Sequence, residues 1–157
     1  PLRALSLEGL MRRCSASAQV LVNHAGLELL QVDSGVADQE VLANESMVEQ
    51  IVLNLVDNAC KHGRNPTCDR IEMSLVSDRS AVGLEIRDFG TVRWEPGVKE
   101  PFSKSAQEAA RTSPGVGLGL SVSQRLAEQM GAELRFLQDP LHGTKARLMW
   151  KCPPLKG

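Results

Sequence analysis

The sequence predicts an α+β domain with a mixed, mostly antiparallel sheet and helices on one face. Three apolar runs have helical spacing, and a pair of short strand-like runs follows each of them. We expect the helices at residues 6–25, 45–62 and 115–130, and the strand pairs at 27–32 with 39–42, 71–75 with 82–86, and 134–136 with 146–150.

The first helix is predicted from apolar residues that share one face between Leu7 and Val22, with Gly26 at its end. The turn residues Asp33–Gly35 separate the two strand candidates that come next. In the central helix, Asn44 or Ser46 is placed to cap the first turn. The elements up to residue 62 are therefore a helix, two strands and a second helix.

Beyond the central helix, two alternating runs predict a hairpin that turns at Asp78–Ser80 and leads into Asp88-Phe89-Gly90. Residues 91–115 carry no period, apart from a short helix expected at 106–110, and loops of this length are commonly functional lids. The last helix should end at Gly131, and a closing hairpin should turn at residues 139–143.

Composition limits the classes of function. The chain has 157 residues, the size of one domain, and 18 basic residues balance 19 acidic ones, so neither nucleic acid nor an anionic membrane is expected as partner. The four cysteines form no C-x-x-C pair and the three histidines show no zinc spacing, which indicates reduced thiols in the cytosol. No apolar run has the length of a membrane span.

The central helix carries an unusual polar stripe. Gln50, Asn54, Asn58 and Lys61 fall on one face, although Asn is a poor helix former. An amide oxygen is a suitable neutral ligand for Mg²⁺, and a lysine can meet a phosphate as a point charge. The stripe therefore favours a metal–phosphate site, and the alternative is a solvated helix face that carries Asn.

Two further stretches suit a nucleotide. The glycines of residues 115–119 open a helix, where free N–H groups attract phosphate, although they fit neither of the two common nucleotide fingerprints and could equally form a hinge. Asp88 stands at a strand end, where a carboxylate can accept the exocyclic amine of adenine, and the alternative is an ordinary turn. A protein-kinase metal motif at Asp88–Gly90 is excluded, because no glycine-rich loop opens the chain and no H-R-D loop precedes it.

Taken in order, these stretches resemble the ATP-binding catalytic domain of sensor histidine kinases, within the GHKL superfamily that also holds gyrase and the ninety-kilodalton heat-shock chaperone. The resemblance covers roughly residues 27–150. Residues 54–62 look like the N box, Asp88-Phe89-Gly90 the G1 box, Glu100-Pro101-Phe102 the F box, and residues 115–121 the G2 box. It implies a two-layer α/β sandwich of the Bergerat type, with ATP between the helices and a mobile lid at about 91–116.

The resemblance also implies roles for individual residues. Asn58 would hold Mg²⁺, Asn54 would support the metal or its water, and Lys61 would meet a phosphate. Asp88 would read adenine. The remaining residues that the resemblance places at the nucleotide are His62, Gly90, Phe102, Gly115, Gly117, Gly119, Leu120 and Thr144.

Asn54 distinguishes branches of this family. ATP-hydrolysing relatives carry Glu there as general base, and Asn cannot take a proton at neutral pH. We therefore expect negligible ATP hydrolysis and transfer of the γ-phosphoryl group to a histidine on another domain. No histidine of this chain is followed by an acidic residue, as the family's acceptor is, so the chain is expected to be the catalytic part only.

One position departs from the pattern. Val92 stands where the G1 box usually has a second Gly, and a β-branched residue disfavours positive φ, so the loop after Gly90 should follow another path or alter the adenine pocket. The other functions considered are a serine kinase of the anti-sigma type, a degenerate domain that binds protein, and a small gyrase-like ATPase. Asn54 disfavours the last.

The resemblance sets further expectations. Residues 1–25 would link from a dimerisation and phosphoacceptor domain of the same parent, and residues 26–157 would form the catalytic domain. A response regulator would act downstream. The fragment is expected in the cytoplasm without contacting a membrane itself, and whether its parent is membrane-anchored is left open.

Overall fold

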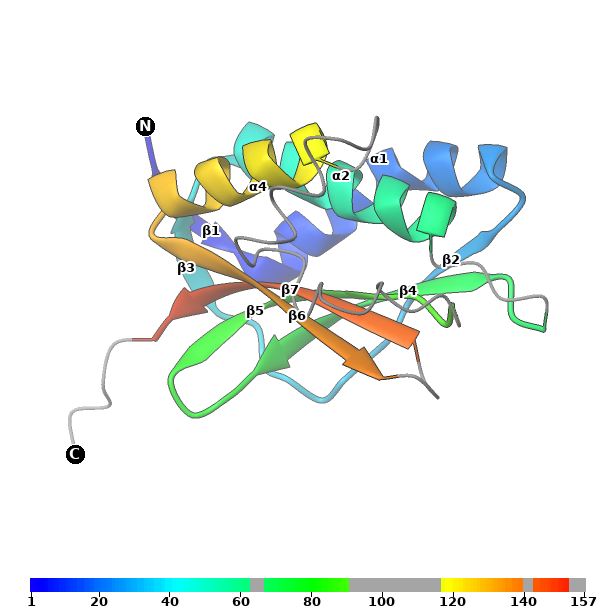
Figure 1. The fold of residues 1–157 in the computed structure, drawn as a ribbon. Helices are drawn as coiled ribbons and strands as arrows, with labels where there is room; N and C mark the ends of the chain where they lie inside the picture. The colour runs from blue at the N-terminus through cyan, green and yellow to red at the C-terminus, as the bar shows by residue number, and fades with distance from the viewer. Residues whose placement is uncertain (63–66, 91–116, 140–142, 153–157) are drawn as a thin grey trace.

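The described residues of the computed structural model, 1–62, 67–90, 117–139 and 143–152, form two layers, with helices on one face of a sheet (Figure 1). The helices are α1 (Leu7–His24), α2 (Glu45–His62) and α4 (Gly117–Gln129). The strands are β1 (Arg3–Ser6), β2 (Glu28–Gln31), β3 (Glu40–Ala43), β4 (Arg70–Ser77), β5 (Ala81–Arg87), β6 (Ala132–Asp139) and β7 (Gly143–Lys151). This arrangement confirms the predicted fold class.

The main sheet has the strand order β2-β4-β5-β7-β6, in which β2 runs parallel to β4 and the other neighbours are antiparallel. The predicted hairpins of β4 with β5 and of β6 with β7 are confirmed. The expected pairing of residues 27–32 with 39–42 is wrong, because β2 joins the main sheet while β3 pairs with β1. The β1 strand has no alternating pattern of its own, so only its partner reveals it.

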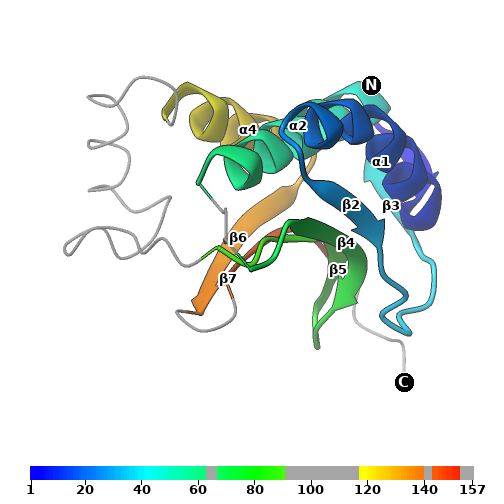
Figure 2. The same ribbon diagram turned by 90° about the vertical axis from the view of Figure 1, so that its right-hand side faces the viewer.

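The three helices lie side by side over the sheet, with α2 between α1 and α4 (Figure 2). Ser6 caps α1, because its Oγ accepts a hydrogen bond from the Gly9 N–H at 3.0 Å. Of the two candidate caps for α2, the structure selects Asn44, whose Oδ1 accepts from the Met47 N–H at 3.1 Å. Gly131, with φ of 69°, follows α4 as expected.

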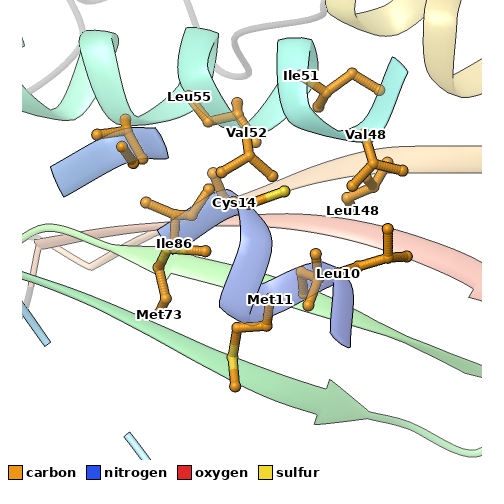
Figure 3. Packing of buried hydrophobic residues seen from close by; sticks show 14 of the residues in the cluster. Leu10, Met11, Cys14, Val48, Ile51, Val52, Leu55, Met73, Ile86 and Leu148 are labelled. Carbon is orange, nitrogen blue, oxygen red and sulfur yellow. The ribbon is translucent and has the colours of Figure 1, made fainter. Parts of the chain in front are cut away.

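The core forms where the apolar stripe of α2 meets α1 and the sheet, as the close-up of Figure 3 shows. Val48, Ile51 and Val52 of α2 are completely buried. Their neighbours in the cluster come from α1 (Leu10, Met11, Cys14) and from the strands (Met73, Ile86, Leu148). Because this stripe of α2 packs inward along the helix, it determines which way the polar stripe of the same helix faces.

The smaller sheet is tied to the main one by Trp150, whose indole Nε1–H donates to the Leu42 carbonyl oxygen at 3.1 Å. All four cysteines are free thiols. Burial raises the pKa of the Cys14 thiol to about 12, so this group stays protonated at neutral pH. Among the described residues, no helix combines the length and apolar character needed to cross a membrane.

We expect Leu148→Ala to lower the free energy of unfolding by about 2–5 kcal/mol, because the removed atoms leave a cavity beneath α2. The matched control is Leu42→Ala, since Leu42 is 61% exposed and its truncation should change stability by less than about 0.5 kcal/mol. Urea unfolding followed by circular dichroism measures both. Equal effects of the two substitutions would contradict this description of the core.

Candidate functional site

The polar stripe of α2 lies beside the buried one. Asn54 and Asn58, one helical turn apart, are both half-buried, whereas Lys61 is exposed. The Lys61 Nζ lies 2.9 Å from Asp57 Oδ2 in an exposed i,i+4 ion pair. Such a pair contributes little to stability and is easily exchanged. The Lys61 ammonium group can therefore turn to an anion at small cost.

Asn54 connects the stripe to the glycine-rich start of α4. Its Nδ2 donates to the Ser123 Oγ at 3.0 Å and to the Gly119 carbonyl oxygen at 3.3 Å. Gly119 also faces this side chain, because a Cβ built on it would have the Asn54 Cγ as its nearest atom, at 3.8 Å. The tertiary structure thus brings two predicted site residues, 65 positions apart, into direct contact.

The second group of predicted residues surrounds Asp88, at the end of β5. The side chain is buried, and its Oδ1 accepts from the Gly90 N–H at 3.0 Å and from the Thr144 N–H at 3.2 Å. Burial raises the pKa of this carboxyl group, and the two backbone hydrogen bonds oppose that rise in part. Within the part of the chain that the structure describes, the backbone holds Oδ1 and the other carboxyl oxygen, Oδ2, is available to a donor.

The backbone of β7 approaches Asp88 closely at Gly143. This residue has φ of 88°, and a Cβ on it would lie 2.0 Å from the Asp88 carbonyl oxygen. Only glycine fits this position, for both its backbone conformation and the close contact. This role of Gly143 was not predicted from the sequence. Its signal is a glycine at the start of a strand, but its partner, Asp88, is 55 positions earlier in the chain.

Phe89 has an environment that the sequence analysis did not foresee. The guanidinium carbons of Arg70 and Arg87 lie 5.0 Å and 4.5 Å from its ring centroid. Each distance is within the range of a cation–π contact. The two arginines come from neighbouring strands. Strand alternation shows that they share one face of the sheet, but only when the register of β4 against β5 is known. The contacts hold the residue next to Asp88 in place.

The structure brings together Asn54 with Gly119, and Asp88 with Gly90 and Thr144. Figure 1 shows that α2 ends above the same end of the sheet where β7 begins. Leu120 is a buried residue of α4, Gly117 begins that helix, and His62 ends α2. Phe102, Gly115, Val92, the lid and the short helix at 106–110 lie outside the described residues, and so does most of the turn at 139–143.

The model of the "Histidine kinase-, DNA gyrase B-, and HSP90-like ATPase" family matches residues 43–154, well over half of the chain. The signal transduction histidine-protein kinase BarA of Escherichia coli (strain K12) is 31% identical over 76% of this chain, which is 14% of its own length. The sensor histidine kinase YkoH of Bacillus subtilis (strain 168) is 32% identical over 70% of this chain and 24% of its own length.

Solved structures give the same fold. The mycobacterial sensor histidine kinase MprB has a TM-score of 0.71 at 20% identity, with 99% of this chain and 100% of that chain covered. The ATP binding domain of PrrB from Mycobacterium tuberculosis has a TM-score of 0.69 at 21% identity, covering 97% and 98%. At these identities the likeness establishes the fold alone. The chain spans only about a seventh to a quarter of the length of the two curated relatives above.

The environment of Asp88 predicts an effect on stability. Asp88→Asn should be at least as stable as wild type at pH 7, because it removes a buried charge while an amide oxygen still accepts from Gly90 and Thr144. The folded-state pKa lies above 3.8, so the stability contributed by Asp88 is full below that value and is lost as pH rises through the folded-state pKa. The advantage of Asp88→Asn should therefore grow with pH.

Denaturant unfolding at pH 3 and pH 7 measures this dependence. Asp78→Asn is the matched control, because hydrogen bonding from the Ser80 N–H lowers the pKa of the exposed Asp78 and reverses the sign. Marked destabilisation by Asp88→Asn at pH 7 would show that the ionised Asp88 carboxylate stabilises the fold.

Proposed function

The chain belongs to the histidine kinase-, DNA gyrase B- and HSP90-like ATPase family, and we propose that it binds Mg²⁺–ATP and donates the γ-phosphoryl group to a histidine on a separate domain. The observation that carries the proposal is the Asn54 side chain on α2, in contact with the glycine-rich start of α4. The relatives are named as histidine kinases, which does not favour a serine kinase or a protein-binding domain as the alternative.

Adenine recognition is assigned to Asp88. Its Oδ1 is occupied by backbone donors, which leaves Oδ2 as the acceptor for an exocyclic amine. Buried polar groups normally have a hydrogen-bond partner, and an ionised carboxylate can only accept hydrogen bonds. A buried carboxylate oxygen at a strand end is therefore suited to bind an amino group. Gly90 and Thr144 act by holding the carboxyl in one orientation.

The chemistry of the side chains fits Mg²⁺. Asn54 and Asn58 provide neutral carboxamide oxygens one turn apart, and Mg²⁺ that arrives with ATP brings most of its ligands as phosphate oxygens and water. We assign Asn58 as the metal ligand and Asn54 as the residue that supports the metal or its water. When bound, Mg²⁺ neutralises charge on the phosphates. Lys61 would exchange Asp57 for a phosphate oxygen.

Asn54 also argues for transfer over hydrolysis. A carboxamide cannot take a proton from water, and both hydrogens of its NH₂ group are directed to α4. The residues at the phosphates would therefore act by positioning and by charge neutralisation. The acceptor would be a histidine of a dimerisation domain in the same parent protein, with a response regulator downstream.

The location of the chain is part of the proposal. The solved structure of the cytoplasmic segment of histidine kinase QseC resembles it, with a TM-score of 0.62. We propose that this chain also works in the cytoplasm, as a catalytic part of a longer sensor kinase. Residues 1–25, which contain α1, would lead in from the dimerisation domain.

Asp88→Asn should weaken binding of a non-hydrolysable Mg²⁺–ATP analogue by about 10-fold or more, since a hydrogen bond to a charged acceptor is lost. Isothermal titration calorimetry measures the affinity. Asp78→Asn, in the turn that precedes β5 and so at the other end of that strand from Asp88, should bind like wild type. If Asp88→Asn keeps full affinity while remaining folded, Asp88 does not read the base.

Wild-type chain should show negligible steady-state ATP hydrolysis, because Asn54 provides no general base. A coupled assay for released ADP measures it. The chain should likewise take up no acid-labile label when incubated alone with γ-labelled ATP. Sustained ATP turnover, or a stable label on one of the chain's own histidines, would contradict the proposal that this chain is a transferase whose acceptor lies on another domain.

A further inference from the structure

Among the α4 residues whose burial the structure describes, one polar side chain is buried, that of Ser123, at 0% exposure. Its buried neighbours at helical spacing are Leu120 and Ala127, with Met130 just beyond the end of the helix. Packing alone does not require a hydroxyl here, because an alanine would also fill this position. The hydroxyl accepts a hydrogen bond from Asn54 Nδ2 at 3.0 Å, so this polar position in an apolar stripe serves a residue on another helix.

The hydrogen bonds determine the orientation of the Asn54 carboxamide. The Gly119 carbonyl oxygen can only accept, so the group facing it must be the NH₂ and not the oxygen. The Ser123 Oγ takes a hydrogen of the same NH₂ group. With both hydrogens directed to α4, Oδ1 is the remaining polar atom of the side chain. The Gly119 carbonyl oxygen opposes the flip that would exchange nitrogen and oxygen, because it cannot donate, and the Ser123 Oγ is the second and shorter hydrogen bond that anchors the NH₂ group.

We propose that Ser123 is a positioning residue that keeps the Asn54 Oδ1 turned toward the Mg²⁺ of a bound nucleotide. This inference rests on the proposed function, and it adds a residue that does not itself touch metal or nucleotide. The Gly119 bond is the longer of the two, so without Ser123 the carboxamide is held by its weaker contact alone. The side chain then samples orientations that turn Oδ1 away from the metal.

The first test observes the hydrogen bond directly, in the 157-residue chain without metal or nucleotide. In Ser123→Ala, hydrogen exchange of the Asn54 side-chain NH₂, followed by NMR and assigned by its loss in Asn54→Ala, should accelerate about 3- to 10-fold. The matched control is Ser121→Ala, which removes an exposed hydroxyl of the same helix and should leave the exchange rate of the Asn54 NH₂ unchanged in the absence of nucleotide. Unchanged exchange in Ser123→Ala would overturn the inference.

The second test separates positioning from packing. Calorimetry with a non-hydrolysable ATP analogue should show Ser123→Ala binding about 3- to 10-fold more weakly than wild type in Mg²⁺, but equally well in EDTA. In an Asn54→Ala background, Ser123→Ala should have no further effect, because the residue it positions is gone. Equal weakening with and without Mg²⁺, or an undiminished effect in that background, would indicate a structural role and overturn the inference.

The two tests also distinguish this inference from the proposed function. If wild type binds no nucleotide in Mg²⁺, the proposed function and the role of Ser123 both fail, whatever the NMR result. If wild type binds in Mg²⁺ and Ser123→Ala matches it, only the role of Ser123 fails. Normal thermal unfolding of Ser123→Ala is expected, since the buried face keeps its apolar members.

Discussion

The packing of α2 against α1 and the sheet is the constraint on which the rest of the molecule depends. Val48, Ile51, Val52 and Val56 are fully buried, and a helix with such a stripe has a single favourable rotation about its axis. That rotation turns Asn54 toward α4 and leaves Asn58 half-buried beside it. The position of the polar groups is thus a consequence of apolar burial, since the polar contacts alone are too weak to hold a helix.

The candidate site is held together by contacts between distant segments, mostly through the backbone. Asp88 is bonded to backbone N–H groups of Gly90 and Thr144, and the Gly143 backbone approaches it where no side chain would fit. The Arg70 and Arg87 guanidinium groups flank the adjoining Phe89. These contacts fix the orientation of the Asp88 carboxyl group, whose charged form burial disfavours. A buried ionisable group held in this way is characteristic of binding sites.

Asn54 combines two constraints in one side chain. Its carboxamide ties α2 to α4 through Ser123 and Gly119, and the same group cannot itself act as a general base at neutral pH. An acidic side chain at this position would be repelled by the Gly119 carbonyl oxygen. The contact between helices and the proposed preference for transfer over hydrolysis are therefore linked through the hydrogen-bonding capacity of one residue.

The sequence by itself determined the three long helices, both hairpins of the main sheet and the family, because periodicity, turn residues and motif spacing are local properties. It did not reveal β1, the separation of β2 from β3, or the partners of Asn54, Phe89 and Gly143. Each of these depends on segments far apart in the chain, and a contact between such segments is decided only when the layers pack.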